Sequence, residues 1–126
     1  MKDINEIISY KDKEFRLVFN LNVMEEIQAE YGSLEKWGEL TDGSAAGEPD
    51  AKAVIFGFAA MLNEGIDMTN EETGAEEKPL TLKQVGRIIT EVGLANATQI
   101  LNNTVVESTE SAEKNASSTR RKKSTR

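Results

Sequence analysis

The chain has 126 residues, a formal net charge of −7, no cysteine and no histidine. This length predicts a single domain, and the missing residue types exclude thiol nucleophiles, disulfides, Cys/His zinc sites and histidine general bases. No apolar run approaches the roughly 20 residues that a helix needs to span a bilayer. The composition therefore predicts a soluble intracellular protein.

The charge is unevenly distributed along the chain. Every acidic residue lies at or before Glu113, and the segment after it is basic, with Lys114, Arg120, Arg121, Lys122, Lys123 and Arg126. An acidic body argues against a nucleic-acid-binding surface on the fold itself. The basic segment is expected to be a solvated end of the chain, which could contact RNA or an acidic partner only weakly and without sequence specificity.

Two strands are predicted at the start of the chain, over residues 4–10 and 14–19, with a polar turn at 11–13. Apolar Phe15, Leu17 and Phe19 alternate with other residues, which is the period of two expected for a strand with one buried face. This pattern predicts an antiparallel β-hairpin. The hairpin must pack on helices, because an isolated hairpin is only marginally stable in water.

Two short helices are predicted next. The first has Asn22 as its N-cap, Glu25 as the second residue of a capping box and Gly32 at its end, with an apolar face of Met24, Ile27 and Tyr31. The second begins after Ser33 and has an apolar face of Leu34, Trp37 and Leu40. Trp37 and Tyr31 are predicted to close these helices against each other rather than to form an exposed binding anchor.

A longer and more apolar helix is predicted between Asp50, its N-cap, and Gly65. A loop at 41–49 precedes it, and an acidic, mobile loop at 67–79 follows it. Its broad apolar face predicts that it is the most buried helix. Gly57 inside this helix costs up to about 1 kcal/mol relative to Ala, and close approach of another element would explain its presence.

The next helix shows the clearest start signal in the chain. Thr81 and Gln84 form a predicted capping box, Gly93 ends the helix, and its apolar face consists of Leu82, Val85, Ile88, Ile89 and Val92. A last helix is predicted to run from about residue 94 to near residue 110.

The predicted fold class is therefore α+β, with an N-terminal β-hairpin packed on a small bundle of four to five helices. The domain is expected to span residues 1–107. Residues 108–126 contain no aromatic or large aliphatic side chain, so they cannot offset their ordering entropy and are predicted to form a disordered polar and basic tail.

No set of residues in the sequence predicts catalysis or a cofactor site. Glu25–Glu26 lie next to each other on a helix and point in different directions, and the pairs Glu71–Glu72 and Glu76–Glu77 lack the spacing of a calcium loop. The glycines form neither a phosphate-binding loop nor a dinucleotide fingerprint. We therefore expect a protein that is not an enzyme and that binds no metal or cofactor.

The segment KEFRLVFNLNVMEEIQAEYGSLEKW resembles the N-terminal part of the tail assembly chaperones of siphophages and prophages of Gram-positive bacteria. These proteins have a hairpin with an F-x-L-x-F strand and then a helix of the type L-N-x-hydrophobic-E-E that ends in Y-G-S. The matching residues are Phe15, Leu17, Phe19, Leu21, Asn22, Met24, Glu25, Tyr31, Gly32 and Ser33. The later elements follow in the same order, so the resemblance covers approximately residues 10–106.

This resemblance implies an assembly factor of the host bacterial cytoplasm that binds the tape measure protein, keeps it soluble and helps to recruit tail tube subunits. It also implies a longer form of the chain made by programmed frameshifting, and Lys122–Lys123 are compatible with a slippery A-rich codon run. The expected client groove lies between the third and fourth predicted helices. Its candidate protein-binding residues are Val54, Phe58, Met61, Leu62, Val85, Ile88 and Ile89.

Three alternatives remain open from the sequence. The main one is a structural or connector-type phage tail adaptor, which would persist in virions. The others are a metal-dependent hydrolase that uses the carboxylates and a regulatory protein that contacts RNA through its basic tail.

Overall fold

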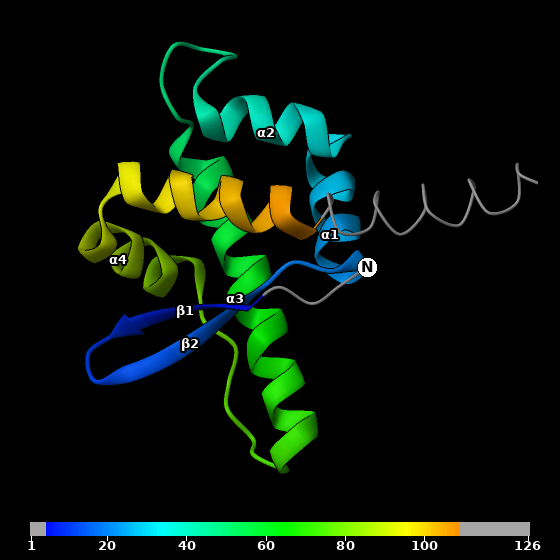
Figure 1. Ribbon diagram of the computed structural model, residues 1–126, viewed down its shortest axis with the longest axis vertical. Coiled ribbons are helices and arrows are strands. Elements are labelled where there is room, and N and C mark those ends of the chain that lie inside the picture. The colour runs from blue at the N-terminus through cyan, green and yellow to red at the C-terminus, as the bar shows by residue number, and fades with distance from the viewer. Residues whose placement is uncertain (1–4, 109–126) are drawn as a thin grey trace, which may run out of the picture.

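The computed structural model describes residues 5–108, which form a β-hairpin followed by five helices (Figure 1). The labelled elements are β1 (Asn5–Tyr10), β2 (Lys13–Val18), α1 (Leu21–Tyr31), α2 (Leu34–Asp42), α3 (Ala51–Thr73) and α4 (Leu82–Val92). A further helix over residues 94–108, yellow to orange in Figure 1, is called the C-terminal helix here. This is the predicted α+β architecture. Of the predicted disordered tail, all but Ser108 lies outside the described residues.

The hairpin has the register that a two-residue turn imposes. Tyr10 pairs with Lys13 and Ile8 with Phe15, and the turn residues Lys11 and Asp12 both have positive φ, 49° and 63°. Positive φ at both central residues is the geometry of a type I′ turn, which matches the twist of the flanking strands. Phe15, Leu17 and Phe19 are buried as predicted, but Val18 between them is buried too, and Phe19 follows the last residue of β2.

Helix α3 is the centre of the molecule. Strand β2 and helices α1, α2 and α4 all contact it, and it runs through the middle of the fold (Figure 1). Gly57 faces the indole of Trp37, and a Cβ atom at this position would overlap the ring. The close approach predicted for Gly57 is therefore confirmed, and Trp37 also donates a hydrogen bond from Nε1 to the Ala53 carbonyl at 2.9 Å.

The predicted end of this helix at Gly65 is wrong. Helix α3 continues to Thr73 and ends at Gly74, which has a left-handed φ of 76°. Gly65 is a packing position instead, since a Cβ atom there would overlap the backbone carbonyl of Arg16. The predicted mobile loop at 67–79 is therefore helical over its first half.

The predicted start of α1 is also wrong, by two residues. Asn20 is the N-cap, and its Oδ1 accepts a hydrogen bond from the Val23 amide at 3.2 Å. Asn22 lies in the first turn, where its side chain donates to Glu64 at 3.1 Å. The predicted capping box with Glu25 therefore does not form, because its N-cap position belongs to Asn20.

The other predicted helix ends agree with the structure. Ser33, Asp50 and Thr81 are N-caps whose side chains accept backbone hydrogen bonds, and Gly32 and Gly93 follow the ends of their helices. The capping box of Thr81 and Gln84 is present in both directions. Ser108, the first residue of the predicted tail, is helical and buried.

Candidate protein-binding groove

The seven predicted protein-binding residues lie in the core. All are at most 5% exposed, and they belong to one hydrophobic cluster, namely Val54, Phe58, Met61, Leu62, Val85, Ile88 and Ile89. The structure thus brings the predicted residues together where α3 meets α4. In this conformation, however, they form the interior of the domain and offer no surface to a partner.

An open groove lies at the same junction and is lined by other residues. Its volume is about 410 Å³, and its lining consists of Lys52, Ile55, Phe56, Leu82, Lys83 and Gly86. Ile55 and Phe56 are half-buried, whereas Leu82 is 59% exposed. These side chains, with the stems of the two lysines, give the groove an almost purely apolar surface.

The aromatic wall of this groove is fixed by a second ring. Tyr31 contacts Phe56 edge to face, with ring centroids 5.5 Å apart and planes at 78°. Burial raises the pKa of the Tyr31 hydroxyl, and the nearby Asp50 and Glu30 carboxylates raise it further. Tyr31 therefore remains a neutral phenol, and it holds Phe56 at the edge of the groove.

The floor of the groove is shaped by a missing side chain. Gly86 is an interior residue of α4, and a Cβ atom there would meet Ile55 Cδ1 at 3.7 Å, an ordinary van der Waals distance. A Cβ atom at position 86 would therefore cause no clash, but a side chain there would occupy the space between α3 and α4. The absence of a side chain keeps the groove open.

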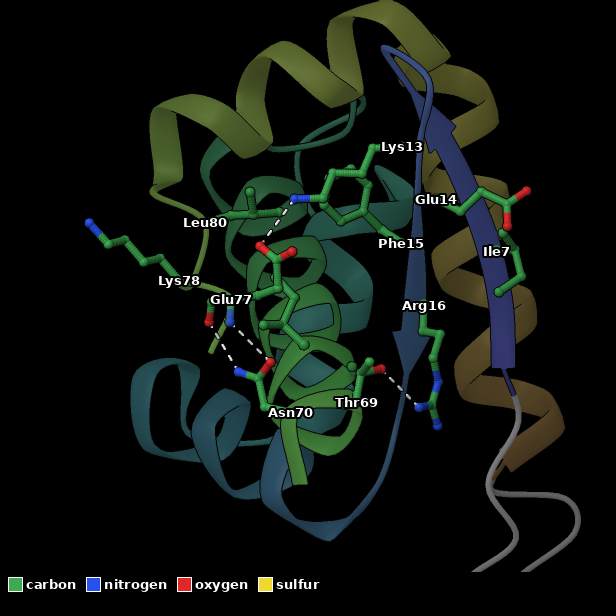
Figure 2. A pocket seen from close by; sticks show the side chains of 12 residues that line it. Ile7, Lys13, Glu14, Phe15, Arg16, Thr69, Asn70, Glu77, Lys78 and Leu80 are labelled. Carbon is green, nitrogen blue, oxygen red and sulfur yellow. Dashed lines mark hydrogen bonds and ion pairs between the residues drawn. The ribbon is translucent and has the colours of Figure 1, made fainter. Parts of the chain in front are cut away.

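Two asparagines on α3 hold the connection that leads into α4. Asn63 donates to the Leu80 carbonyl at 3.1 Å and accepts from the Leu80 amide at 2.7 Å. Asn70, about two helical turns further on, makes the same pair of bonds with the Glu77 backbone at 3.0 and 3.1 Å (Figure 2). The acidic connection is therefore tied to α3, and the start of α4 with its exposed Leu82 is placed at the groove.

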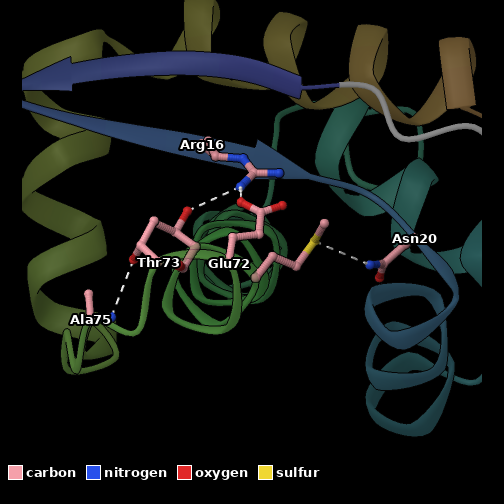
Figure 3. A network of polar contacts seen from close by, with 7 residues as sticks. Arg16, Asn20, Glu72, Thr73 and Ala75 are labelled. Carbon is pink, nitrogen blue, oxygen red and sulfur yellow. Dashed lines mark hydrogen bonds and ion pairs between the residues drawn. The ribbon is translucent and has the colours of Figure 1, made fainter.

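A second pocket, of about 400 Å³, lies between the hairpin and the far half of α3 (Figure 2). Ion pairs cross its edges, from Lys13 to Glu77 at 3.2 Å and from Arg16 to Glu72 at 2.9 Å. Arg16 also donates to Thr69 Oγ1 at 3.1 Å. Figure 3 shows Arg16 reaching across to the last turn of α3. The charged groups at the edges of the pocket are paired with each other, and these ion pairs connect the hairpin to α3 and to the segment that follows it.

Four carboxylates line a shallow pocket between α1 and α3, namely those of Glu25, Glu26, Glu64 and Asp67. Burial raises the pKa of Glu26, and the charges of Glu64, Glu25 and Asp67 raise it further. Among residues 5–108, no group of three or more acidic side chains is arranged to hold a metal ion.

None of the described helices has the length and apolar character of a membrane-spanning segment.

The chain matches no protein-family model, and neither a curated protein nor a solved structure matches it. The groove between α3 and α4 was found from the structure, because helical periodicity identifies the buried face and gives no signal for residues at its margin. Of the lining residues, Leu82 was predicted to lie on an apolar helix face, but its exposure at the groove could not be read from the sequence.

Proposed function

We propose that this protein is a phage tail assembly chaperone that binds the tape measure protein and keeps it soluble in the cytoplasm of the host bacterium. The observation that supports this most is the open apolar groove between α3 and α4. An amphipathic helix that lays its apolar face into a groove is a common mode of peptide recognition.

The resemblance of residues 13–37 to tail assembly chaperones supports the same proposal. In the structure these residues form β2, α1 and the first half of α2, which are scaffold elements that pack on α3. The client site is assigned to the groove between α3 and α4, whose Phe56 contacts Tyr31 of this scaffold. The acidic composition of the chain favours the role, since net charge keeps a client-loaded complex from associating with others.

The proposal extends to two further partners. Tail tube subunits would be recruited to the loaded tape measure protein, and a longer, frameshifted form of this chain would take part in the same assembly. The DNA that encodes Lys122–Lys123 tests the second point. A slippery codon run followed by an overlapping reading frame is expected, and its absence would remove the longer form from the proposal.

Co-expression with a tape measure fragment tests the client-binding role. The wild-type chain is expected to raise the soluble fraction of the fragment, and Leu82→Glu is expected to abolish most of this gain, because it puts a charge into the groove at an exposed position. Leu94→Glu is the matched control, since Leu94 is 44% exposed and lies outside the groove. If the fragment is equally insoluble with and without the wild-type chain, the proposal fails.

The composition of finished particles distinguishes a chaperone from a structural tail adaptor. A chaperone acts during assembly and is expected to be absent from purified virions, whereas an adaptor would be retained at a fixed copy number. Quantitative mass spectrometry of purified particles measures this directly. Recovery of the chain in stoichiometric amounts would favour the adaptor.

A further inference from the structure

The charges beside α4 have the opposite sign to most of the chain. The sequence has 22 Asp and Glu against 15 Lys and Arg, but the groove between α3 and α4 is lined by two lysines and no carboxylate. A pocket of about 340 Å³ on the other flank of α4 is likewise lined by cations alone among its charged residues, namely Lys11, Lys13 and Arg87. Basic residues therefore outnumber carboxylates around α4, whose own sequence has a single acidic residue, Glu91.

The two lysines of the groove come from different helices. Lys52 lies in the first turn of α3 and Lys83 in the first turn of α4, so that each helix contributes one cation to the groove. Both side chains are exposed. Neither forms an ion pair with any of the residues 5–108. Their ammonium groups are therefore available to a partner that covers the apolar residues between them.

The cations on the other flank of α4 make the electrostatic potential around this helix more positive. Arg87 follows Lys83 by one turn on α4, so both project from the solvent side of the helix. Lys13 is partly neutralised by its ion pair with Glu77, but Lys11 and Arg87 have no ion-pair partner within the described part of the chain. The carboxylates Glu25, Glu26, Glu64 and Asp67 lie around a different junction, between α1 and α3.

We infer that the groove binds helical segments whose apolar stripe is flanked by carboxylates, and that it discriminates against segments flanked by basic residues. The apolar residues Ile55, Phe56 and Leu82 would bury the stripe, and Lys52 and Lys83 would pair with the flanking acidic side chains. Complementary charge of this kind raises the rate of encounter and selects among partners. The inference rests on the proposed function for the identity of the partner, a segment of the tape measure protein.

Three designed helical peptides test the charge preference directly. They share one stripe of Leu residues at positions i, i+3, i+4 and i+7, and their flanking positions carry Glu, Gln or Lys. Exposed ion pairs contribute modestly, so each lysine is expected to change affinity roughly two- to fivefold at low ionic strength. Fluorescence anisotropy should therefore show that affinity decreases from the Glu peptide to the Gln peptide to the Lys peptide. Added salt should reduce these differences in affinity, because it screens exposed charges.

A charge-reversal variant provides the specific control. Lys52→Glu combined with Lys83→Glu is expected to reverse the order of the three peptides. Lys36→Glu combined with Lys78→Glu makes the same change in net charge at exposed positions outside both α4 pockets, and it should leave the order unchanged. The inference is overturned if the Lys peptide binds wild type as tightly as the Glu peptide, if no peptide binds, or if both double variants behave alike.

These outcomes separate the inference from the proposed function. If the three peptides bind with equal affinity but the wild-type chain still solubilises the tape measure fragment, the inferred charge preference is refuted and the proposed chaperone role is retained. If the peptides follow the expected order but the fragment stays insoluble, the chaperone role falls and the groove remains a site for acidic helices.

Discussion

Gly57 and Gly86 are both interior glycines of helices, and their surroundings are opposite. A Cβ atom at Gly57 would overlap the Trp37 indole, whereas at Gly86 it would only touch Ile55. The first glycine permits the tight packing of α2 on α3. The second permits a hollow between α3 and α4.

Gly57→Ala and Gly86→Ala should therefore change stability in opposite directions. Gly57→Ala is expected to destabilise the fold by about 1–3 kcal/mol, because overpacking moves the buried Trp37. Gly86→Ala is expected to stabilise it by up to about 1 kcal/mol through higher helix propensity. Urea denaturation followed by circular dichroism measures both, and a loss of stability in both variants would contradict the assignment of Gly86 as an open position.

Glu26 gives the stability of the domain a dependence on pH. Its pKa is raised in the folded state by partial desolvation of the carboxyl and by the neighbouring carboxylates, so folding favours the protonated form. The contribution of this group is fully present below the unfolded pKa of roughly 4.3 and is lost as the pH rises through the folded pKa. Above that range, the charged carboxylate opposes folding.

Glu26→Gln is therefore expected to stabilise the protein at neutral pH and to have no effect near pH 3. The gain should be at most about 0.5 kcal/mol, because the carboxyl is largely solvated. Denaturation of both proteins at the two pH values measures it. Glu39→Gln, at an exposed position of α2, is the matched control, and a Glu26→Gln variant less stable than wild type at neutral pH would refute the prediction.

At the scale of elements, the connection between α3 and α4 is the least expected feature. Its acidic and turn-rich composition predicted a mobile loop, yet the side chains of Asn63 and Asn70 pair with its backbone at two points. The residue types alone could not reveal this, because asparagine is equally common in loops and on solvated helix faces. Their spacing becomes informative only once α3 is known to continue past Gly65.

Asn63→Ala and Asn70→Ala are expected to release this connection locally. Amide exchange at Leu80 should accelerate at least about tenfold in the first variant, and exchange at Glu77 in the second, because each amide loses its acceptor. Hydrogen exchange followed by NMR gives both rates. Asn102→Ala, an exposed position on the C-terminal helix, should change neither, and unchanged exchange in all three variants would show that the connection is held by other contacts.

The sequence was most informative where a local signal defines an element. Alternation defined β2, and the capping residues Ser33, Asp50 and Thr81 defined the starts of three helices. It was less informative where an outcome depends on tertiary contact, as at Gly65, whose role is set by the backbone of Arg16. The groove illustrates the same limit, since periodicity identified Val54 and Phe58 as apolar but could not show that the neighbouring Ile55 and Phe56 form the accessible surface.

For the whole molecule, the packing around α3 predicts a single cooperative unit. The one tryptophan, Trp37, is buried against α3, and Leu101 on the C-terminal helix belongs to the same hydrophobic cluster. Leu101→Ala is expected to destabilise the domain by about 2–5 kcal/mol. Trp fluorescence and far-ultraviolet circular dichroism should report the same shifted midpoint, and a tryptophan transition that stays at the wild-type midpoint would show that the C-terminal helix unfolds separately.

The central position of α3 also affects how the chain is made. The hairpin, α1 and α2 are synthesised before α3, and the surface of α3 on which they pack is absent until α3 has left the ribosome. During this interval the nascent chain exposes the apolar side chains of β2 and α1, which makes it prone to association. A protein proposed to shield the apolar helices of another chain is thus itself prone to association during synthesis, until α3 emerges.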